Sequence, residues 1–119
     1  MKPLRAIALL GGISSAAFAA DKAPGYGVGM HSCAEFAQAY AADPTTAEDL
    51  YFSWAQGFMS GVNLAYVTST GSYRYINGNE MLSQKSFIRS YCDAHPQAQY
   101  SLAVMDLLNS FPIEKAKLN

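Results

Sequence analysis

Residues 47–67 read AEDLYFSWAQGFMSGVNLAYV, and this stretch decides the fold class that the sequence predicts. Apolar side chains recur along it at helical spacing, and a second apolar row widens the face that they form. We expect a long helix here, at the centre of an all-α bundle of four helices. The residues expected on its inner face are Leu50, Tyr51, Trp54, Ala55, Phe58, Met59, Gly61, Val62, Leu64 and Ala65.

Two glycines interrupt this helix one turn apart, at Gly57 and Gly61. Each costs about 1 kcal/mol relative to Ala in a helix interior, so we expect another backbone or a bulky ring to pack closely there. The stripe on the other side of the helix is polar and uncharged, which fits either a solvated edge or one wall of a polar groove. That stripe consists of Ser53, Gln56, Ser60 and Asn63.

Three shorter helices are predicted around the long one, over residues 33–41, 80–94 and 96–110. Ser32 and Glu35 have the spacing of a capping box at the start of the first of them. We expect the long helix to start at Thr45 or Thr46, and the helix over 80–94 to start at Asn79 or Ser83. The last helix is expected to start at Pro96.

Periodicity also predicts the buried faces of the last two helices. In the helix over 80–94 the inward residues are Leu82, Ile88, Tyr91 and Cys92, and the residues facing water are Lys85, Arg89 and Asp93. In the last helix the inward residues are Tyr100, Val104, Leu107, Leu108 and Phe111, extended by Leu102 and Met105.

Residues 68–79, TSTGSYRYINGN, form the long irregular stretch of the chain, and they predict a loop or a short hairpin between the second and third helices. Tyr73, Arg74 and Tyr75 lie within it. Tyr and Arg dominate the energetics of protein interfaces because they combine a large contact area with a polar tip. Either these side chains fold back over the core, or they form a recognition loop for another protein. We take them as the candidate partner-binding residues.

The first 19 residues have the pattern of a secretory signal peptide. Lys2 and Arg5 precede an apolar stretch over residues 7–18, and Ala17-Phe18-Ala19 has the small-x-small form of a cleavage site. This pattern favours the bacterial periplasm, and since no second long apolar run follows, we expect no stable membrane insertion. The rest divides into a flexible lead-in over 20–31, a helical domain over 32–111 and a fraying tail over 112–119.

Two cysteines, Cys33 and Cys92, are most simply joined by a disulfide in an exported chain. The alternative is a structural zinc site, because His31 and His95 lie near them and would complete a ligand set of two sulfurs and two imidazoles. The oxidising compartment favours the disulfide. A loop of about 60 residues closed in this way stabilises a fold by about 4 kcal/mol in the chain-entropy model.

Composition argues against nucleic-acid binding, and the lack of catalytic motifs in the sequence argues against catalysis. The 119 residues carry a formal charge of -1, so no basic surface for phosphates is expected. The chain has no nucleophile elbow, phosphate-binding glycine loop, zinc-protease motif or dinucleotide fingerprint. Ser60, Asp93 and His95 could be combined into a triad, but so could residues of almost any chain. We therefore expect a non-enzyme without cofactor or metal, in which Trp54, Gly57, Gly61 and Pro96 serve the fold.

Three segments resemble a group of small exported bacterial helical proteins. They are Ser32-Cys33…Phe36, then Trp54-x-x-Gly57-Phe58-x-Ser60-Gly61-x-Asn63, and Phe87-x-x-x-Tyr91-Cys92-x-x-His95-Pro96 before a closing apolar helix. This plan is similar to that of the HdeA-type periplasmic acid chaperones and of the Rap/Tai-type immunity proteins of type VI secretion. Both resemblances imply a periplasmic, non-enzymatic protein that acts by binding another protein.

The two branches imply different modes of action. An immunity role implies that a protruding loop with Tyr73, Arg74 and Tyr75 blocks an envelope-acting effector, and this is the version we favour. A chaperone role implies unfolding by acid: without residues 1–19 the formal charge would move from -3 to +8 as nine carboxylates are neutralised and both histidines are charged. With ordinary pKa values most of this change falls between about pH 5 and pH 3. Either role is compatible with a homodimer.

Overall fold

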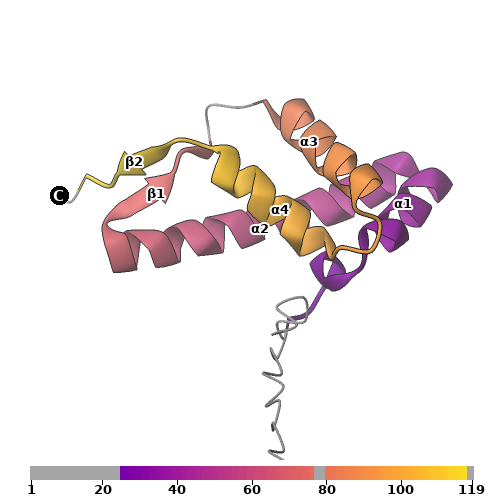
Figure 1. The fold of residues 1–119 in the computed structure, drawn as a ribbon, viewed down its shortest axis with the longest axis horizontal. Helices are drawn as coiled ribbons and strands as arrows, with labels where there is room; N and C mark the ends of the chain where they lie inside the picture. Colours follow the sequence, from indigo (N-terminus) through magenta and orange to yellow (C-terminus); the bar gives the residue numbers. More distant parts are fainter. Residues whose placement is uncertain (1–24, 77–79, 118–119) are drawn as a thin grey trace, which may run out of the picture.

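Four α-helices and a pair of short strands form the computed structural model, which describes residues 25–76 and 80–117 (Figure 1). The all-α class and the four helices are thereby confirmed, and the two strands are a small addition. The predicted signal peptide and the predicted cap Asn79 lie outside the described residues. The elements are η2 (Val28–Met30), α1 (Cys33–Ala42), α2 (Pro44–Thr70), β1 (Ser72–Arg74), α3 (Met81–Ala94), α4 (Tyr100–Ser110) and β2 (Ile113–Lys115).

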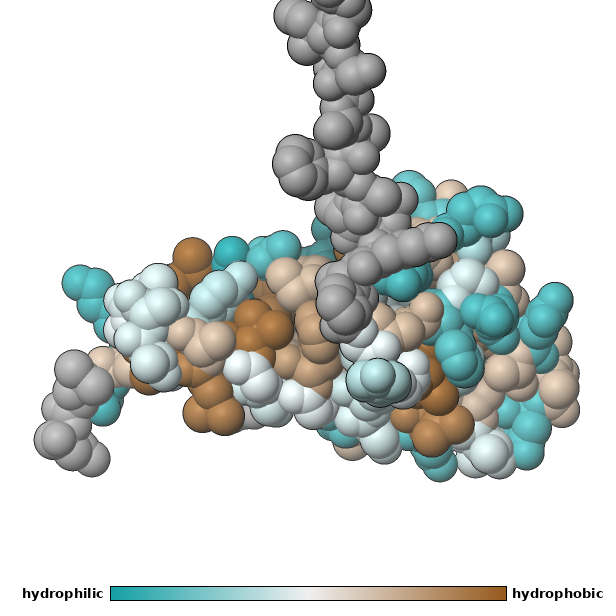
Figure 2. Space-filling model, turned by 90° about the horizontal axis from the view of Figure 1, so that it is seen from below, coloured by the Kyte–Doolittle hydropathy of each residue, from teal (hydrophilic) through white to brown (hydrophobic). Residues whose placement is uncertain are grey.

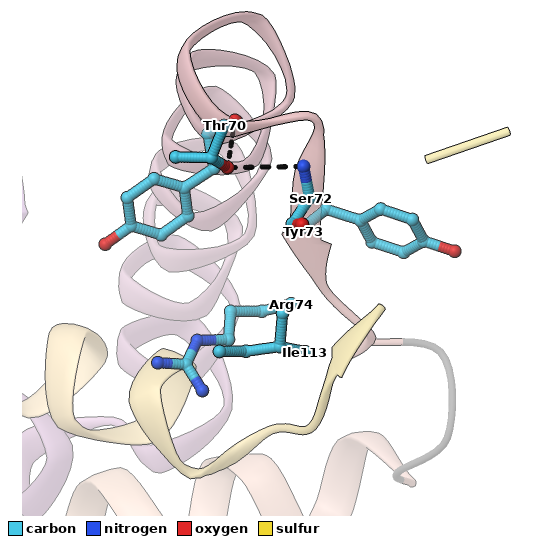
Figure 3. Close-up of a pocket in the computed structure, with 6 residues that line it drawn as sticks. Thr70, Ser72, Tyr73, Arg74 and Ile113 are labelled. Atoms are coloured by element: carbon cyan, nitrogen blue, oxygen red, sulfur yellow. Dashed lines mark hydrogen bonds between the residues drawn. The ribbon is translucent and has the colours of Figure 1, made fainter. Parts of the chain in front are cut away.

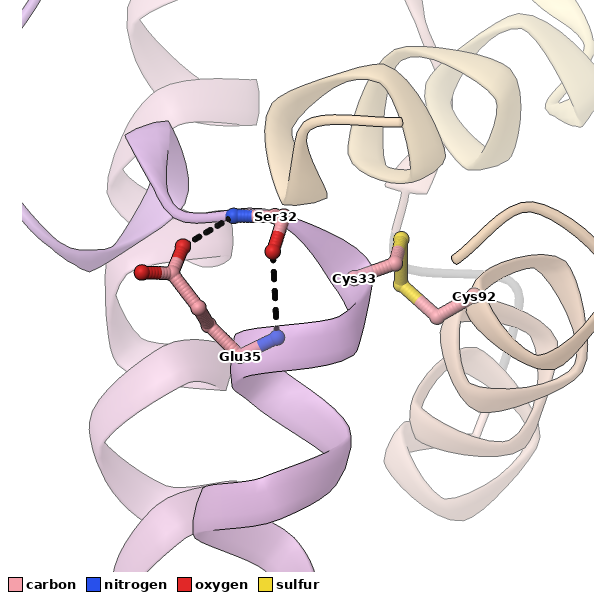
Figure 4. The surroundings of a disulfide bond; sticks show 4 residues. All are labelled: Ser32, Cys33, Glu35 and Cys92. Carbon is pink, nitrogen blue, oxygen red and sulfur yellow. Dashed lines mark hydrogen bonds between the residues drawn. A yellow bond between two sulfur atoms is a disulfide. The ribbon is translucent and has the colours of Figure 1, made fainter. Parts of the chain in front are cut away.

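The capping box at the start of α1 is confirmed. The N–H of Glu35 donates to Oγ of Ser32 at 3.1 Å, and the N–H of Ser32 donates to Oε2 of Glu35 at 2.7 Å. One residue further on, Cys33 forms the predicted disulfide with Cys92 in the last turn of α3, with 4.8 Å between the Cα atoms (Figure 4). The bond therefore joins α1 to α3 next to a fixed helix end.

The long helix α2 begins earlier than the sequence predicted. Its N-cap is Asp43, whose Oδ1 accepts the N–H of Thr46 at 3.2 Å, and Pro44 occupies the first turn, where a missing N–H costs nothing. Thr45 and Thr46 lie inside the helix, so their assignment as caps was wrong. The helix ends at Thr70, and its C-cap Gly71 takes a positive φ of 69°. Its 27 residues give it a length of about 40 Å.

α4 is the most completely buried helix, whereas α2 packs against α1, α4, η2 and β1 along its length. Six of the eleven residues of α4 are buried, and Phe111 directly after it is buried too. α2 is buried mainly in its first half, and Leu50 and Leu64 are 55% and 72% exposed. Apolar residues occur nearly all round α2, so periodicity alone could not show which side faces the core. The buried residues of α2 are Ala47, Tyr51, Phe52, Ala55 and Met59.

The connection between α3 and α4 is longer than predicted, because α4 begins at Tyr100 and not at Pro96. The carbonyls of Pro96 and Ala98 accept the N–H groups of Ala34 and Cys33 at 2.9 and 2.7 Å. These are donors in the first turn of α1, which have no partner within their own helix. Residues 95–99 thus stay outside a helix, where the carbonyls of Pro96 and Ala98 bond the start of α1.

Two of the three residues of α3 that were predicted to face water contact α2 instead, whereas the third, Asp93, is exposed as predicted. Arg89 forms an ion pair with Glu48, and Nζ of Lys85 lies 3.8 Å from a carboxylate oxygen of Asp49. Leu82, predicted to be inward, is 75% exposed. Lys85 and Arg89 face α2 because Asp49 and Glu48 lie there to pair with them. The periodicity of α3 by itself does not show where these partners lie.

The lead-in contains an ordered part that the sequence analysis assigned to a flexible segment. η2 packs against α2 and α4, and Gly29 lies directly on the indole of Trp54. A Cβ atom at Gly29 would lie 2.2 Å from that ring, and Gly27 has a φ of 94°. Trp54 also stacks on Phe58, with 5.1 Å between the ring centroids. The glycines at 27 and 29 are therefore needed for the close approach of the indole.

The close approach predicted at Gly57 and Gly61 is absent. A Cβ atom built at either position meets no heavy atom within 4 Å among the described residues, and both glycines lie on the exposed side of α2. No packing contact in residues 25–76 and 80–117 thus explains why these two positions are glycine.

Candidate functional site

The candidate partner-binding residues belong to a strand pair on the C-terminal half of α2. β1 pairs antiparallel with β2, so that Tyr73 lies opposite Glu114 and Arg74 opposite Ile113. The sequence predicted a loop or a short hairpin within the segment between the second and third helices. Instead, β1 pairs with β2, which belongs to the segment that was expected to fray as a tail. Figure 1 shows β1 lying between β2 and α2.

Arg74 is held in place by both its main chain and its side chain. Its N–H donates to Oδ1 of Asn63 at 2.9 Å, and its carbonyl accepts Nδ2 of Asn63 at 2.8 Å. Its guanidinium donates to the carbonyl of Phe111 at 2.9 Å, directly after the C-terminal end of α4, where a positive charge is favoured by the helix dipole. Arg74 therefore joins α2, β1 and the end of α4.

Tyr73 projects from β1 on the side away from Arg74, as alternation along a strand requires, and Tyr75 directly follows the strand. Figure 3 shows the ring of Tyr73 pointing away from the guanidinium of Arg74. The hydroxyl of Tyr73 donates to Oε2 of Glu114 at 3.0 Å, and this bond to the neutral phenol raises the pKa of Tyr73. Tyr75 donates its N–H to the carbonyl of Pro112 at 2.9 Å, and the residue is 37% exposed.

Two hollows flank β1. One has a volume of about 290 Å³, with its lining residues drawn in Figure 3, and the other has a volume of about 260 Å³. Arg74 is the charged residue that lines them. The first is lined by Tyr66, Thr70, Ser72, Tyr73, Arg74 and Ile113. The second is lined by Ser60, Asn63, Tyr73, Arg74, Tyr75 and Ile76, so two residues of the polar stripe on α2 form one of its walls.

The surface around the hollows is poor in charge. No charged residue occurs between Asp49 and Arg74 in the sequence. In Figure 2, which views the molecule from below, brown and pale side chains cover much of the part over the C-terminal half of α2, and most teal side chains gather toward α1. The two ion pairs found among the described residues join α2 to α3 and do not involve Arg74. Aromatic rings, hydroxyls and the guanidinium of Arg74 are thus the groups beside the hollows, and β2 adds the charges of Glu114 and Lys115 at the edge of this surface.

The three residues of the weak triad take part in other contacts. Oγ of Ser60 donates to the carbonyl of Gln56 at 2.7 Å, within its own helix. His95 lies at the end of α3, where its ring packs on Tyr91 with 4.5 Å between centroids. No hydrogen bond found in the described part of the chain links Ser60, Asp93 and His95, so these three side chains do not form a triad there.

The zinc alternative conflicts with the disulfide, because both sulfurs are bonded to each other. Nδ1 of His31 forms a hydrogen bond with the hydroxyl of Tyr51 at 2.8 Å. Within residues 25–76 and 80–117, no group of three or more His, Cys, Asp and Glu side chains could hold a metal ion. Likewise, none of the helices described there is long and apolar enough to span a bilayer.

Sequence reasoning missed the residues that position the site. Asn63 was placed on a polar stripe without a partner, and Ile113 and Glu114 were assigned to a tail. The signal for a strand was weak: after Pro112 stops the last helix, Ile113 is followed by two charged residues, Glu114 and Lys115, where a half-exposed strand would alternate apolar and polar residues. Three residues are too few for that signal to be distinguished from a loop.

Comparison with protein-family models, curated proteins and solved structures gives no match for this chain. The functional argument therefore depends on the chain's own residues.

Proposed function

We propose that this chain is an exported, non-enzymatic protein-binding factor of the inhibitor or immunity type. It neutralises an envelope-acting protein by direct contact through the surface of β1, β2 and the C-terminal half of α2. The observation that carries the proposal is that Arg74 anchors β1 to two helices, while Tyr73 projects from the other side of the strand (Figure 3) and the exposed Tyr75 directly follows it.

An anchored strand suits binding for an energetic reason. Ordering a loop at an interface costs free energy that is subtracted from the affinity, and a segment that is already fixed avoids this cost. The bonds from Asn63 and Phe111 fix Arg74, and the bond from Pro112 fixes the main chain of Tyr75. Two tyrosines on such a support can act as binding hot spots, because Tyr is enriched at the centres of interfaces.

The location in the proposal rests on the leader pattern and on the disulfide. A disulfide persists in an oxidising compartment such as the periplasm and is rare in the cytosol. The bond between Cys33 and Cys92 supports export to the periplasm, where envelope-acting proteins would be met.

The test starts from the full chain, exported in the cells that produce it, with the photo-crosslinking residue p-benzoylphenylalanine at position 75. A crosslinked protein is identified by mass spectrometry, purified, and mixed with the unlabelled chain at pH 7. We expect a stoichiometric complex by size-exclusion chromatography, weakened about tenfold or more by Tyr75→Ala. The matched control is Tyr26→Ala, since Tyr26 is 97% exposed and lies outside the strand pair. Equal weakening by both variants, or none by either, contradicts the proposal.

An acid-activated holdase is the second candidate, and one group of contacts favours it. The contacts between α2 and α3 include the ion pairs of Glu48 with Arg89 and of Asp49 with Lys85, which acid would break. The test is aggregation of citrate synthase at pH 3 and at pH 7 with and without the chain. Suppression at pH 3 alone would support the holdase, and equal aggregation under all conditions would exclude it.

A further inference from the structure

We propose that the partner is held by strand addition, in which an extended segment of it pairs with the outer edge of β2. This inference rests on the proposed protein-binding function and names the chemistry that the bound segment must have. The starting point is the direction in which the main-chain groups of the two strands point.

The hydrogen bonds at the two ends of the strand pair determine these directions. Tyr75 donates its N–H to Pro112, and Ala116 donates its N–H to Gly71, at 2.9 and 2.8 Å. In an antiparallel pair, the residues that bond across the strands alternate with residues whose N–H and C=O groups point away. Glu114 therefore bonds toward β1, and the N–H and C=O groups of Ile113 and Lys115 point outward.

The inner edge of the sheet, on β1, is closed. The groups of Arg74 that point away from β2 are taken by the amide of Asn63, and the N–H of Ser72 is taken by Oγ1 of Thr70 at 3.2 Å. These bonds agree with the alternation derived above. A further strand can therefore be added only at the outer edge, where all three residues of β2 are exposed and Ile113 is 64% exposed.

The charge of β2 disfavours a second copy of this chain as the occupant. A symmetric antiparallel pairing that uses the outward groups of both Ile113 and Lys115 places Glu114 opposite Glu114 of the other copy. Like charges directly opposite each other destabilise a strand pair. Edge strands commonly carry charges that block pairing with their own kind. The occupant is therefore a segment of another protein whose charges complement those of β2.

The register defines that segment further. The residue opposite Glu114 faces a carboxylate and should be basic, and the residue opposite Lys115 should be acidic. The residue opposite Ile113 lies beside the hollow that Tyr66 and Ile113 line, and should be apolar. For an antiparallel segment, the expected order is acidic, basic, apolar. Main-chain bonds then supply the affinity, and these alternating side chains supply the specificity.

The direct test uses a blocked synthetic peptide with glutamate, arginine and valine in the middle and threonines on both sides. It is titrated to millimolar concentration into the full, oxidised, ¹⁵N-labelled chain. We expect the largest amide shifts at Ile113 and Lys115, and slower hydrogen exchange of those two amides. A peptide N-methylated at the glutamate and valine, whose N–H groups would bond to β2, should bind at least about tenfold more weakly. Shifts elsewhere, or equal binding of both peptides, would overturn the proposal.

A pair of variants separates main-chain from side-chain recognition. Lys115→Pro removes an N–H that points outward and leaves the bonds to β1 in place, since proline is accepted on the free side of an edge strand. It should abolish the shifts, while Lys115→Ala should reduce binding less than about threefold. The amide signals of Tyr73 and Glu114 report whether Lys115→Pro keeps the strand pair. If this variant loses the strand pair, the comparison of the N-methylated with the unmethylated peptide tests main-chain recognition instead.

The same variants, tested on the crosslinked partner, separate the two proposals. Loss of binding through Tyr75→Ala with full binding by Lys115→Pro overturns strand addition and leaves the proposed function standing. Full binding by both variants overturns both. A dimer of the chain alone at pH 7, dissolved by Lys115→Pro, would show that a second copy occupies the edge and would overturn the assignment to another protein.

Discussion

Asn63 bonds to Arg74 as a neighbouring strand would, accepting its N–H and donating to its carbonyl at 2.9 and 2.8 Å. A helix side chain thereby closes one edge of a sheet. Because both main-chain groups would lose their partner, we expect Asn63→Ala to lower the free energy of unfolding by about 1–3 kcal/mol. Urea denaturation measures this, and faster hydrogen exchange of the Arg74 amide localises the loss. Asn109→Ala, at an exposed asparagine of α4, should change stability by less than about 0.5 kcal/mol. Equal losses in the two variants would contradict the role of Asn63.

The contact of Gly29 with Trp54 predicts a cost for one added methyl group. A Cβ atom at Gly29 would lie 2.2 Å from the indole, so the ring must move away from its place on η2 and Phe58. We expect Gly29→Ala to destabilise the chain by about 1–3 kcal/mol, as overpacking does. Thermal and urea denaturation measure the loss, and a changed emission of the single tryptophan reports the moved ring. An unchanged midpoint together with unchanged emission would show that the indole is not in contact with Gly29.

The opposite result is expected for the same substitution at Gly57. Apart from its chain neighbours and the backbone of its own helix, no heavy atom of the described residues lies within 4 Å of the added Cβ, and alanine has the higher helix propensity. Gly57→Ala should therefore raise the free energy of unfolding by about 0.5–1 kcal/mol. The matched comparison is Gly29→Ala, because the chemical change is identical. Destabilisation by Gly57→Ala would mean that the exposed side of α2 packs against something in solution.

The helix caps predict a loss of stability in acid. Bonds from the main chain and side chain of Ser32 lower the pKa of Glu35, and bonds from Thr46 lower the pKa of Asp43. Since both pKa values are lower in the folded than in the unfolded state, the stabilisation is present above about pH 4 and is lost as the pH falls through the folded values. Thermal denaturation between pH 7 and pH 2.5 should show this decline.

A double variant gives the control for the caps. Asn at position 43 and Gln at position 35 keep the capping groups but cannot titrate, so Glu35→Gln with Asp43→Asn should show a shallower decline in acid. A decline as steep as that of the unchanged chain would assign the acid sensitivity to other carboxylates, such as those of the ion pairs between α2 and α3.

The sequence by itself predicted the parts that depend on neighbours in the chain. Helix periodicity and the capping box of Ser32 and Glu35 act within four residues, so α1 and most of α2 and α3 could be derived from local rules. The disulfide followed from the presence of only two cysteines in a chain with an export pattern. For the candidate site, the sequence identified Tyr73, Arg74 and Tyr75 but not what supports them.

Only the tertiary structure decided which segments meet. Tyr73 and Glu114, which share a hydrogen bond, are 41 residues apart in the sequence. Trp54 lies 28 residues after Tyr26, whose carbonyl accepts its indole N–H. No local pattern encodes contacts over such sequence separations. The orientation of α2 was open for the same reason, since apolar residues nearly all round a helix allow several faces to be buried. Pro96 stayed outside α4 because its carbonyl bonds to α1. Local hydrogen bonding and periodicity thus determine the helices, whereas packing between distant segments determines the strand pair and the edge that it leaves open.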